Sequence, residues 1–415
     1  MLKYKIINKK CFIYFDTLKS IKKITDLINI LNIILKEKIK NVVFDFTKLK
    51  QQSYSPVHVS IAGILQYYKE TNKLKFSFNG HDELYIFHTK TNNPLSVILN
   101  KNIFEKNIFD KVIMFETSED VAYISDQIIS QLKYKIVCEE GVLVGLSWCM
   151  NEIMDNVFNH SQTSKGYIMV QLHEKKKKVS ISIYDTGQGI LNSIKQSGEY
   201  NPSNSLEAIN LALGKGVSGN RTVGQGNGMW GLKQIVEINK GHLSIVTGNT
   251  MMDFDFDKNT NKTFDNIAYL SKKSQGTRID FTLNFDKLIN INEALDNYIP
   301  YEKINRDLDE ITTDEGWVIF SVKNEAKEGT GTRISGSKLK KHIINIAKCC
   351  SNRIVIDFSD IEIVTSSFAD EFIGKLLLEI GVLQFMDRFR LINMNKYVFS
   401  MLEKAIITRK NEINC

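Results

Sequence analysis

Apolar and polar positions follow two different periods along this chain, and segments of the two kinds alternate. Apolar residues recur every three or four positions over residues 146–157, which predicts a helix with one buried face. Residues 179–184 alternate strictly, which predicts a strand. Short apolar runs at 42–44 and 354–356, each followed by Asp-Phe, predict buried strands over 41–46 and 353–358. The mixture of periods indicates a protein of the α/β (α+β) class.

The two buried strands belong to an internal repeat at the ends of the chain. Residues 41–49 (NVVFDFTKL) echo residues 353–361 (RIVIDFSDI), and both runs close on aspartate, phenylalanine and a hydroxyl residue. A helical pattern precedes each copy, at 24–35 in the first and 339–347 in the second, and a loop with serines and another helix follow. The repeat predicts two similar α/β domains with parallel strands.

Length and composition are those of an ordinary globular protein. The 415 residues give room for two to four domains, and 43% apolar with 24% charged residues excludes a disordered chain. The sequence has no run of eighteen apolar residues, and its first residues alternate like a strand instead of forming the apolar core of a signal peptide. We therefore expect a cytoplasmic protein with no membrane partner.

The net charge of +7 does not by itself indicate a nucleic-acid partner. The excess is nearly all lysine, whereas arginine, which forms forked contacts to bases and phosphates, is scarce. The basic run at residues 175–178 lies between two strand-like segments, where a hairpin turn is the natural interpretation. The six cysteines show no metal-binding spacing, so reduced thiols are expected. We expect no nucleic acid to bind.

Candidate chemistry begins on the helix predicted at 146–157. Glu152, Asn156 and His160 fall four residues apart and form one polar stripe along that helix. A carboxylate and an amide in adjacent turns can hold a water molecule and a divalent metal side by side, which phosphoryl transfer needs. The simpler interpretation is a solvated helix face, with His160 as a cap at the helix end.

Three glycine-containing segments follow the helix. The strand at 179–184 ends in Asp185 and the loop 186–190 (TGQGI). Residues 224–232 (GQGNGMWGL) open a helical pattern, and a helix start exposes main-chain N–H groups that can hold phosphate. Residues 276–283 (GTRIDFTL) begin another strand. Each segment alone is a common turn, but this order of segments is hard to obtain by chance.

The ordered set resembles the N box and the successive glycine boxes of the GHKL ATP-binding superfamily, which includes gyrase, heat-shock chaperones, histidine kinases and mismatch-repair ATPases. Within the superfamily, residues 120–286 look most like the anti-sigma-factor serine kinases. The resemblance implies a Bergerat-type α/β sandwich that binds ATP and Mg²⁺.

The resemblance also implies a role for each matching residue. Asn156 would coordinate magnesium between the phosphates, and Glu152 would be the general base that activates water or a hydroxyl. Asp185 would accept a hydrogen bond from the adenine amino group, and Thr277 would support the adenine. The glycines that would let the main chain pass close to the base or the phosphates are Gly187, Gly189, Gly226, Gly228 and Gly231.

Residues 191–223, between the two glycine boxes, are expected to form a flexible lid. The lid carries Lys215 and Arg221, either of which could touch the terminal phosphate, although a solvated loop lysine is an equally good interpretation of Lys215. The second glycine box departs from the family pattern, because methionine and tryptophan at 229–230 separate two of its glycines. We expect the extra bulky residue to reshape the phosphate loop.

The C-terminal copy of the repeat resembles STAS-like domains, relatives of anti-sigma-factor antagonists, and the N-terminal copy looks like a more distant one. In the antagonists, a serine of the segment Asp-Ser-Ser-Gly-Leu is phosphorylated by the partner kinase. Here residues 365–369 read TSSFA, so Ser367 matches the acceptor and Ser366 lies beside it. Because both flanking residues differ, a helix N-cap is an equally good interpretation of these serines. In the N-terminal copy, residues 53–56 (SYSP) favour a purely structural cap.

We therefore expect a GHKL ATPase domain between two STAS-like α/β domains. The expected bounds are 1–112 for the N-terminal STAS-like domain, 113–290 for the ATP-binding domain, 291–315 for a linker and 316–415 for the C-terminal STAS-like domain. Protein partners are expected to bind through the STAS-like domains. The resemblance also implies a possible homodimer, because GHKL modules commonly dimerise.

Three functions fit this organisation. A serine kinase would use Glu152 to take the proton from a serine of a STAS-type partner or from Ser367 itself. An ATP-hydrolysing switch would use Glu152 to activate water and would couple lid closure to a domain rearrangement. A scaffold would bind nucleotide without phosphotransfer. Because both Glu152 and Asn156 are present, turnover is favoured over a dead pocket, and we slightly favour the kinase.

Overall fold

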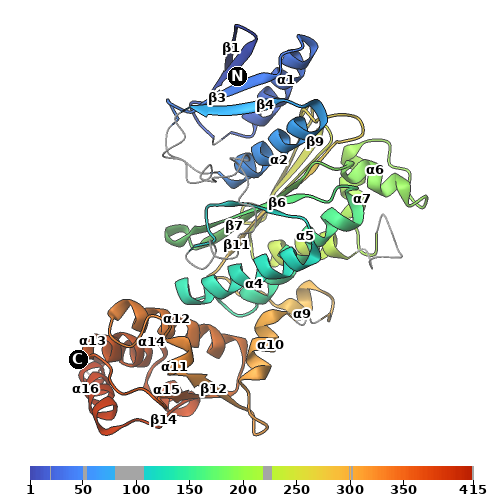
Figure 1. Ribbon diagram of the computed structural model, residues 1–415. Helices are drawn as coiled ribbons and strands as arrows, with labels where there is room; N and C mark the ends of the chain where they lie inside the picture. Colours follow the sequence, from blue (N-terminus) through green and yellow to red (C-terminus); the bar gives the residue numbers. More distant parts are fainter. Residues whose placement is uncertain are drawn as a thin grey trace. The chain divides into compact units, whose positions relative to one another are not determined.

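The computed structural model describes most of the chain, and the chain forms two compact units (Figure 1). The residues outside the described part are 19, 50–53, 80–106, 218–226, 299, 301 and 414–415. Unit 1 comprises Met1–Ile128, Trp148–Asn284 and Ile291–Tyr298. Unit 2 comprises Ile129–Ser147, Phe285–Asn290 and Ile299–Cys415.

The N-terminal part of unit 1 is a four-stranded sheet with two helices. Its strands, in spatial order, are β1 (Lys3–Ile7), β2 (Lys10–Tyr14), β3 (Asn41–Asp45) and β4 (Lys75–Asn79). The pair β1–β2 is antiparallel, and β2–β3 and β3–β4 are parallel as the repeat predicted. The helices are α1 (Lys22–Lys36) and α2 (Ser55–Asn72).

The second sheet of unit 1 has seven strands and is antiparallel throughout. Its spatial order is β10 (Thr260–Phe264), β9 (Thr250–Asp255), β8 (His242–Thr247), β11 (Thr277–Asn284), β7 (Lys178–Asp185), β6 (Gly166–His173) and β5 (Val112–Phe115). The basic run forms the turn between β6 and β7, where Lys177 has a positive φ of 52°, so the hairpin prediction is confirmed.

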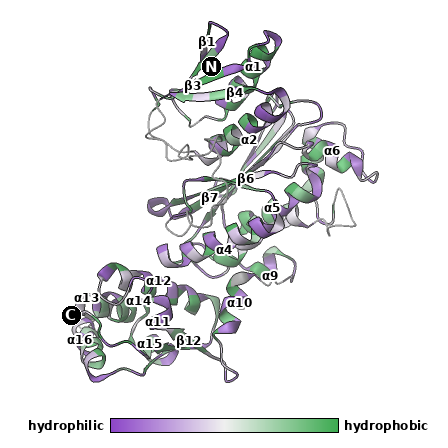
Figure 2. Ribbon diagram, in the orientation of Figure 1, coloured by the Kyte–Doolittle hydropathy of each residue, from purple (hydrophilic) through white to green (hydrophobic). Residues whose placement is uncertain are grey.

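The remaining helices of this region include the predicted N-box helix. They are α4 (Ser118–Lys135), α5 (Val142–His160), α6 (Gly189–Gln196), α7 (Ser205–Ala212), α8 (Gly228–Ile238) and the short α9 (Ile291–Ala294). The helix predicted at 146–157 is confirmed by α5, and both α2 and α5 carry hydrophobic residues along their length (Figure 2).

Helix α2 lies between the two sheets of unit 1, in contact with β4 on one side and with β5, β6, β7 and β11 on the other (Figure 1). Every residue from Ser55 to Leu65 is buried, so the first three turns of the helix have no solvent-facing side. Tyr167 and Tyr184 of the seven-stranded sheet share one hydrophobic core with α1 and α2. The second half of β7 is therefore buried on both faces.

Unit 2 is built on a parallel sheet with the order β12 (Trp317–Ser321), β13 (Arg353–Asp357) and β14 (Phe389–Ile392). Its helices are α10 (Lys303–Glu310), α11 (Val322–Glu325), α12 (Arg333–Cys349), α13 (Ser366–Ala369), α14 (Lys375–Ile380), α15 (Val382–Arg388) and α16 (Lys396–Ile413), with a π-helical turn, η3 (Asp370–Gly374), before α14. Asn345 of α12 also holds the connection between α4 and α5, since its amide bonds to the main chain of Lys133, Ile136 and Cys138 at 2.7–3.0 Å.

The repeated Asp-Phe-hydroxyl signature forms the same turn in both copies. The carboxylate of Asp45 accepts a hydrogen bond from the Thr47 main-chain N–H at 3.0 Å, and that of Asp357 accepts one from Ser359 at 2.9 Å. The preceding strands β3 and β13 also share one burial pattern, with the three central residues of each strand buried. The internal repeat predicted from sequence is thus confirmed at the level of local structure.

Within the described part of the chain, every helix is too short or too polar to span a lipid bilayer.

Candidate functional site

Unit 1 contains a pocket between α5, the seven-stranded sheet and the helices α6, α7 and α8. Five of the residues singled out in the sequence line it: Asn156, Asp185, Gly189, Gly228 and Thr277. These residues come from α5, β7, α6, α8 and β11, so segments more than 100 residues apart in the chain meet at one cavity. The remaining wall is largely apolar, as is usual in pockets that bind small molecules.

Glu152 lies one turn before Asn156 on α5 and reaches the start of α8. A methyl group placed on Gly228 would come within 2.6 Å of Glu152 Oε2, so glycine lets α8 begin this close to the carboxylate. The free N–H groups at the start of a helix favour anionic groups. The structure therefore brings the amide of Asn156 and the start of α8 to the pocket lining, with the Glu152 carboxylate next to Gly228.

Asp185 lines the same pocket, as the last residue of β7. Its side chain is 6% exposed and accepts a hydrogen bond from the Gly187 main-chain N–H at 2.7 Å. Burial raises the pKa of this carboxyl to about 7, although hydrogen bonds from the Gly187 and Thr277 main chains act in the opposite direction. Thr277, the first residue of β11, is the direct cross-strand partner of Asp185.

The loop after Asp185 is held by close contacts that only glycine allows. A side chain on Gly187 would come within 2.1 Å of the Ser161 carbonyl oxygen, and Gly189 has a φ of 79°. Thr247, which the sequence reasoning missed, ties this loop to β11: its hydroxyl accepts from the Ile190 N–H and donates to the Gly276 carbonyl, each at 3.0 Å. A threonine at the end of an ordinary strand gives no local signal of this role.

His160 lines the pocket as well, one turn after Asn156. Burial lowers the pKa of its imidazole, so the ring is neutral at physiological pH. The polar stripe of Glu152, Asn156 and His160 is therefore not a solvated helix face, because it points toward the pocket or its rim.

Four of the predicted phosphate-side residues lie elsewhere or are not described. Gly231 packs against Trp148, where an added methyl group would come within 2.3 Å of the indole, so the structure places this glycine in helix packing. Lys215 forms an ion pair with Asp296 and lies 5.2 Å from the Trp230 ring centre, away from the pocket lining. Gly226 and Arg221 lie outside the described residues.

The segment expected to be a flexible lid contains most of α6 and all of α7, and the loop after α7 is tied to the start of α8. Asn227, just before α8, accepts a hydrogen bond from the Gly216 N–H at 3.1 Å, next to the Lys215–Asp296 ion pair. The bulky residue that departs from the family pattern, Trp230, packs beneath the Lys215 ammonium group. Trp230 is thus a contact of the lid.

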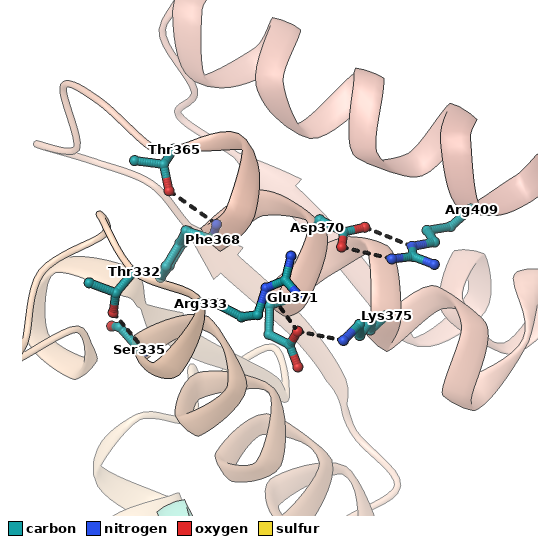
Figure 3. A network of polar contacts seen from close by, with 9 residues as sticks. All are labelled: Thr332, Arg333, Ser335, Thr365, Phe368, Asp370, Glu371, Lys375 and Arg409. Atoms are coloured by element: carbon teal, nitrogen blue, oxygen red, sulfur yellow. Dashed lines mark hydrogen bonds and ion pairs between the residues drawn. The ribbon is translucent and has the colours of Figure 1, made fainter.

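The candidate acceptor serines lie at the start of α13 in unit 2. Ser366 and Ser367 are both exposed, and the cap of this helix is Thr365, whose hydroxyl accepts from the Phe368 N–H at 3.1 Å (Figure 3). The interpretation of the two serines as the N-cap is therefore wrong, since the residue before them fills that position.

Ion pairs fix the helical segment that follows these serines. Asp370 receives two hydrogen bonds from Arg409 of α16 at 2.7 and 2.8 Å, and Glu371 contacts Lys375 at 2.6 Å (Figure 3). Gly336 of α12 lies against the Phe368 carbonyl, so the first turns of α12 and α13 lie side by side. The exposed serines thus project from a rigid base.

Comparison with known families identifies two domains. Residues 141–287 match the family of histidine kinase-, DNA gyrase B- and HSP90-like ATPases, and residues 335–399 match a STAS-like domain family of unknown function (DUF4325). The chain therefore carries a GHKL-type ATP-binding domain followed by a STAS-like domain, as the sequence motifs predicted.

Two solved structures are also similar to the chain, at low identity and low TM-score. Full-length ShkA in complex with AMPPNP is 10% identical, with a TM-score of 0.22, over 70% of this chain and 56% of that one, so the chain spans little more than half of its length. The ATP-binding domain of topoisomerase IV from Francisella tularensis, in complex with a small-molecule inhibitor, is 17% identical, with a TM-score of 0.20, over 48% of this chain and 86% of that one. No curated protein matches the chain.

Proposed function

We propose that this protein binds Mg-ATP in the pocket of unit 1 and transfers the terminal phosphoryl group to a serine hydroxyl of a STAS-like domain. The acceptor is Ser366 or Ser367 of this chain or of a second copy, or the matching serine of a STAS-type partner. The observation that supports this most is the contrast between the two serines and their cap: Thr365 caps α13, which leaves both serine hydroxyls exposed and available.

The residues of the pocket suit the two ends of ATP. Asp185 and Thr277 offer a buried acceptor and a hydroxyl to the adenine, whose amino group needs an acceptor. The phosphates would lie toward Gly228, where the N–H groups that begin α8 favour negative charge. Asn156 lines the pocket from α5, one turn after Glu152, which lies beside Gly228.

The donor chemistry at Asn156 fits magnesium. An amide oxygen is a suitable hard ligand, and among the described residues no group of three or more His, Cys, Asp or Glu side chains could hold a metal alone. Phosphate oxygens and water would therefore complete the ligand set around Asn156. Magnesium bound there would neutralise charge on the phosphates during transfer.

Glu152 is the general base of the proposed reaction. It takes the proton from the serine hydroxyl while the serine oxygen forms a bond to the terminal phosphorus. The bond from that phosphorus to the bridging oxygen breaks, and its electron pair leaves with ADP. The N–H groups at the start of α8 stabilise the charge that develops.

The test is mass spectrometry of the intact protein and its peptides after incubation with Mg-ATP, with ADP measured in the same sample. We expect one phosphoryl group on the peptide that carries Ser366 and Ser367, and none in a Glu152→Ala variant. If ATP binds and ADP forms without any phosphopeptide, even when a separate STAS-like domain is supplied, the kinase proposal fails.

The second candidate is a hydrolytic switch in which Glu152 activates water. The contacts of the lid favour it, because Lys215 and Gly216 are held by Asp296 and Asn227, and a bound phosphate would compete with Asp296 for the lysine. ADP formation without protein modification would select this function. ATP binding with neither product would select a nucleotide-binding scaffold.

A further inference from the structure

One cross-strand pair of residues in the seven-stranded sheet lies directly behind the proposed adenine site. Asp185 and Thr277 are cross-strand partners whose side chains line the pocket. The next pair along the two strands is Tyr184 and Arg278. Because side chains alternate across a sheet, this second pair lies on the opposite face, where α2 packs.

Arg278 is anchored to α2. Its side chain is 3% exposed, and its Nε donates to Asp280 at 2.8 Å while its Nη1 donates to the Ser60 hydroxyl at 3.2 Å. The Ser60 hydroxyl in turn donates to the Pro56 carbonyl at 2.7 Å. In the described part of the chain, Arg278 Nη2 has no hydrogen-bond partner, so Ser60 is the partner through which the guanidinium reaches α2.

Tyr184 is held by the next turn of the same helix. A methyl group on Gly63 would come within 2.6 Å of the Tyr184 ring and within 3.2 Å of the Tyr167 ring. The helix therefore lies close against the sheet, and Tyr184 is buried, at 8% exposure. A shift of α2 by a fraction of an ångström would press on the residue that immediately precedes Asp185.

We propose that Ser60 and Gly63 of α2, acting through Arg278 and Tyr184, are positioning residues for the base of the nucleotide. The N-terminal domain is then the rear wall of the nucleotide site, and the position of α2 sets how well Asp185 and Thr277 recognise adenine. This inference rests on the proposed binding of ATP in that pocket, and it adds a determinant of base selectivity from outside the ATP-binding domain.

Ser55 on the same helix provides a matched control. Its hydroxyl accepts from Ser182 at 2.8 Å, and Ser182 lies on the same face of β7 as Tyr184 but pairs with Asp280, two residue pairs further from the adenine end. Both serines are buried, at 2% and 1% exposure, so truncation to alanine removes one buried hydroxyl in each case. The two variants differ in the contact that they remove: Ser60→Ala removes the hydrogen bond to Arg278, and Ser55→Ala removes the one to Ser182.

The experiment compares Ser60→Ala with Ser55→Ala in the full chain. Dissociation constants for ATP and GTP are measured by calorimetry, and thermal unfolding is followed in the same buffer. We expect Ser60→Ala to reduce the preference for ATP over GTP by about fivefold, the worth of roughly one hydrogen bond. Ser55→Ala is expected to keep the wild-type preference while lowering the melting temperature by a similar amount.

Each outcome decides one question. An unchanged ATP preference in Ser60→Ala, with both variants equally destabilised, overturns the positioning role and leaves an ordinary packing contact. An equal loss of ATP preference in both variants also overturns it, because the effect would then not depend on the contact to Arg278, which lies next to Asp185 and Thr277. A wild-type protein that binds no ATP refutes the proposed function itself and this inference with it. Gly63→Ala, which presses on Tyr184 directly, is expected to reduce the ATP preference at least as much as Ser60→Ala.

Discussion

The two copies of the internal repeat share a strand and a turn but differ in what happens to the helix that follows. Asp45 and Asp357 fold the chain in the same way. In the N-terminal copy the next helix, α2, begins at Ser55, which is 2% exposed and bonded to Gln171 and Ser182 of the seven-stranded sheet. In the C-terminal copy the next helix begins at Ser366, and its first two serines are exposed.

The difference shows that a local signature determines the turn and leaves the accessibility of the following serine undetermined. Accessibility depends on the surface that covers the helix, and α2 is enclosed between two sheets. In α13, Phe368 and Ala369 provide the buried side, while Ser366 and Ser367 face outward. The same sequence motif thus precedes a buried structural helix in one copy and a helix with two exposed candidate acceptor serines in the other.

The largest expected effect tests this comparison directly. Replacing both Ser366 and Ser367 by alanine should abolish phosphorylation of the chain, because both exposed serine hydroxyls at the start of α13 are removed and the Thr365 hydroxyl is engaged as the helix cap. Ser55→Ala should leave the amount of phosphate unchanged, since that hydroxyl is buried. Phosphopeptide mass spectrometry distinguishes the two. A phosphate found on Ser55 of the folded protein would break the comparison.

The next effect concerns the base. Glu152→Ala should lower the rate of phosphoryl transfer or hydrolysis by about 10²–10⁴-fold, the usual contribution of a general base, and should leave ATP binding intact. The rate is measured by ADP release, and binding by calorimetry. Asn156→Ala is the companion variant and should instead abolish binding that depends on magnesium. Normal turnover in Glu152→Ala would contradict the assignment of the base.

A third effect follows from the raised pKa of Asp185. The ionised carboxylate is a stronger acceptor for the adenine amino group than the protonated carboxyl, so ATP affinity should fall as the pH drops below a pKa of about 7. Asp185→Asn should remove this dependence and erode the discrimination between ATP and GTP. Affinities measured between pH 5.5 and 8, chosen as roughly one unit either side of that pKa, provide the check.

Stability of the ligand-free protein should change in the opposite sense. The folded state raises the pKa of Asp185 above its ordinary value of 3.8, so it holds the proton more tightly than the unfolded chain does. The stabilising contribution of this proton is complete below about pH 4 and is lost as the pH rises through about 7. Thermal melting of wild type and Asp185→Asn across this range would show it as a pH slope present only in wild type.

The smallest expected effect tests whether the shared turn contributes equally to stability in the two copies of the repeat. Asp45→Ala and Asp357→Ala each remove the carboxylate that receives the turn hydrogen bonds, and each should lower the free energy of unfolding by about 1 kcal/mol. Chemical denaturation of the two variants gives the comparison. Markedly unequal losses would mean that the shared turn is supported differently in the two copies.

Much of the fold and of the candidate site could be predicted from the sequence, because periodicity and glycine placement are local properties. The pattern at 146–157 predicted α5, and the runs at 41–46 and 353–358 predicted β3 and β13. The resemblance to GHKL ATPases assigned Asp185, Gly189, Gly228 and Thr277 to one site, and these four residues line one pocket.

The contacts that cross between domains could not be read in the same way. Helix α2 contains serines, a histidine and a glycine among its buried residues, so it lacks a clean apolar stripe, and its enclosure between two sheets leaves no periodic signal. The pairing of Lys215 with Asp296 and the role of Thr247 depend on partners that are distant in the chain. Periodicity shows that a face is buried but not which surface covers it.

The enclosure of α2 has a consequence for synthesis of the protein on the ribosome. The helix ends at Asn72, whereas the last strand it packs on, β11, ends at Asn284, on the order of 200 residues later. At a translation rate of about 5–20 residues per second, the apolar surface of α2 stays uncovered for roughly 10–40 seconds until the sheet that covers it has been synthesised. The nascent N-terminal domain is therefore a natural client for a chaperone during translation, and slow codons before residue 284 would lengthen its exposure.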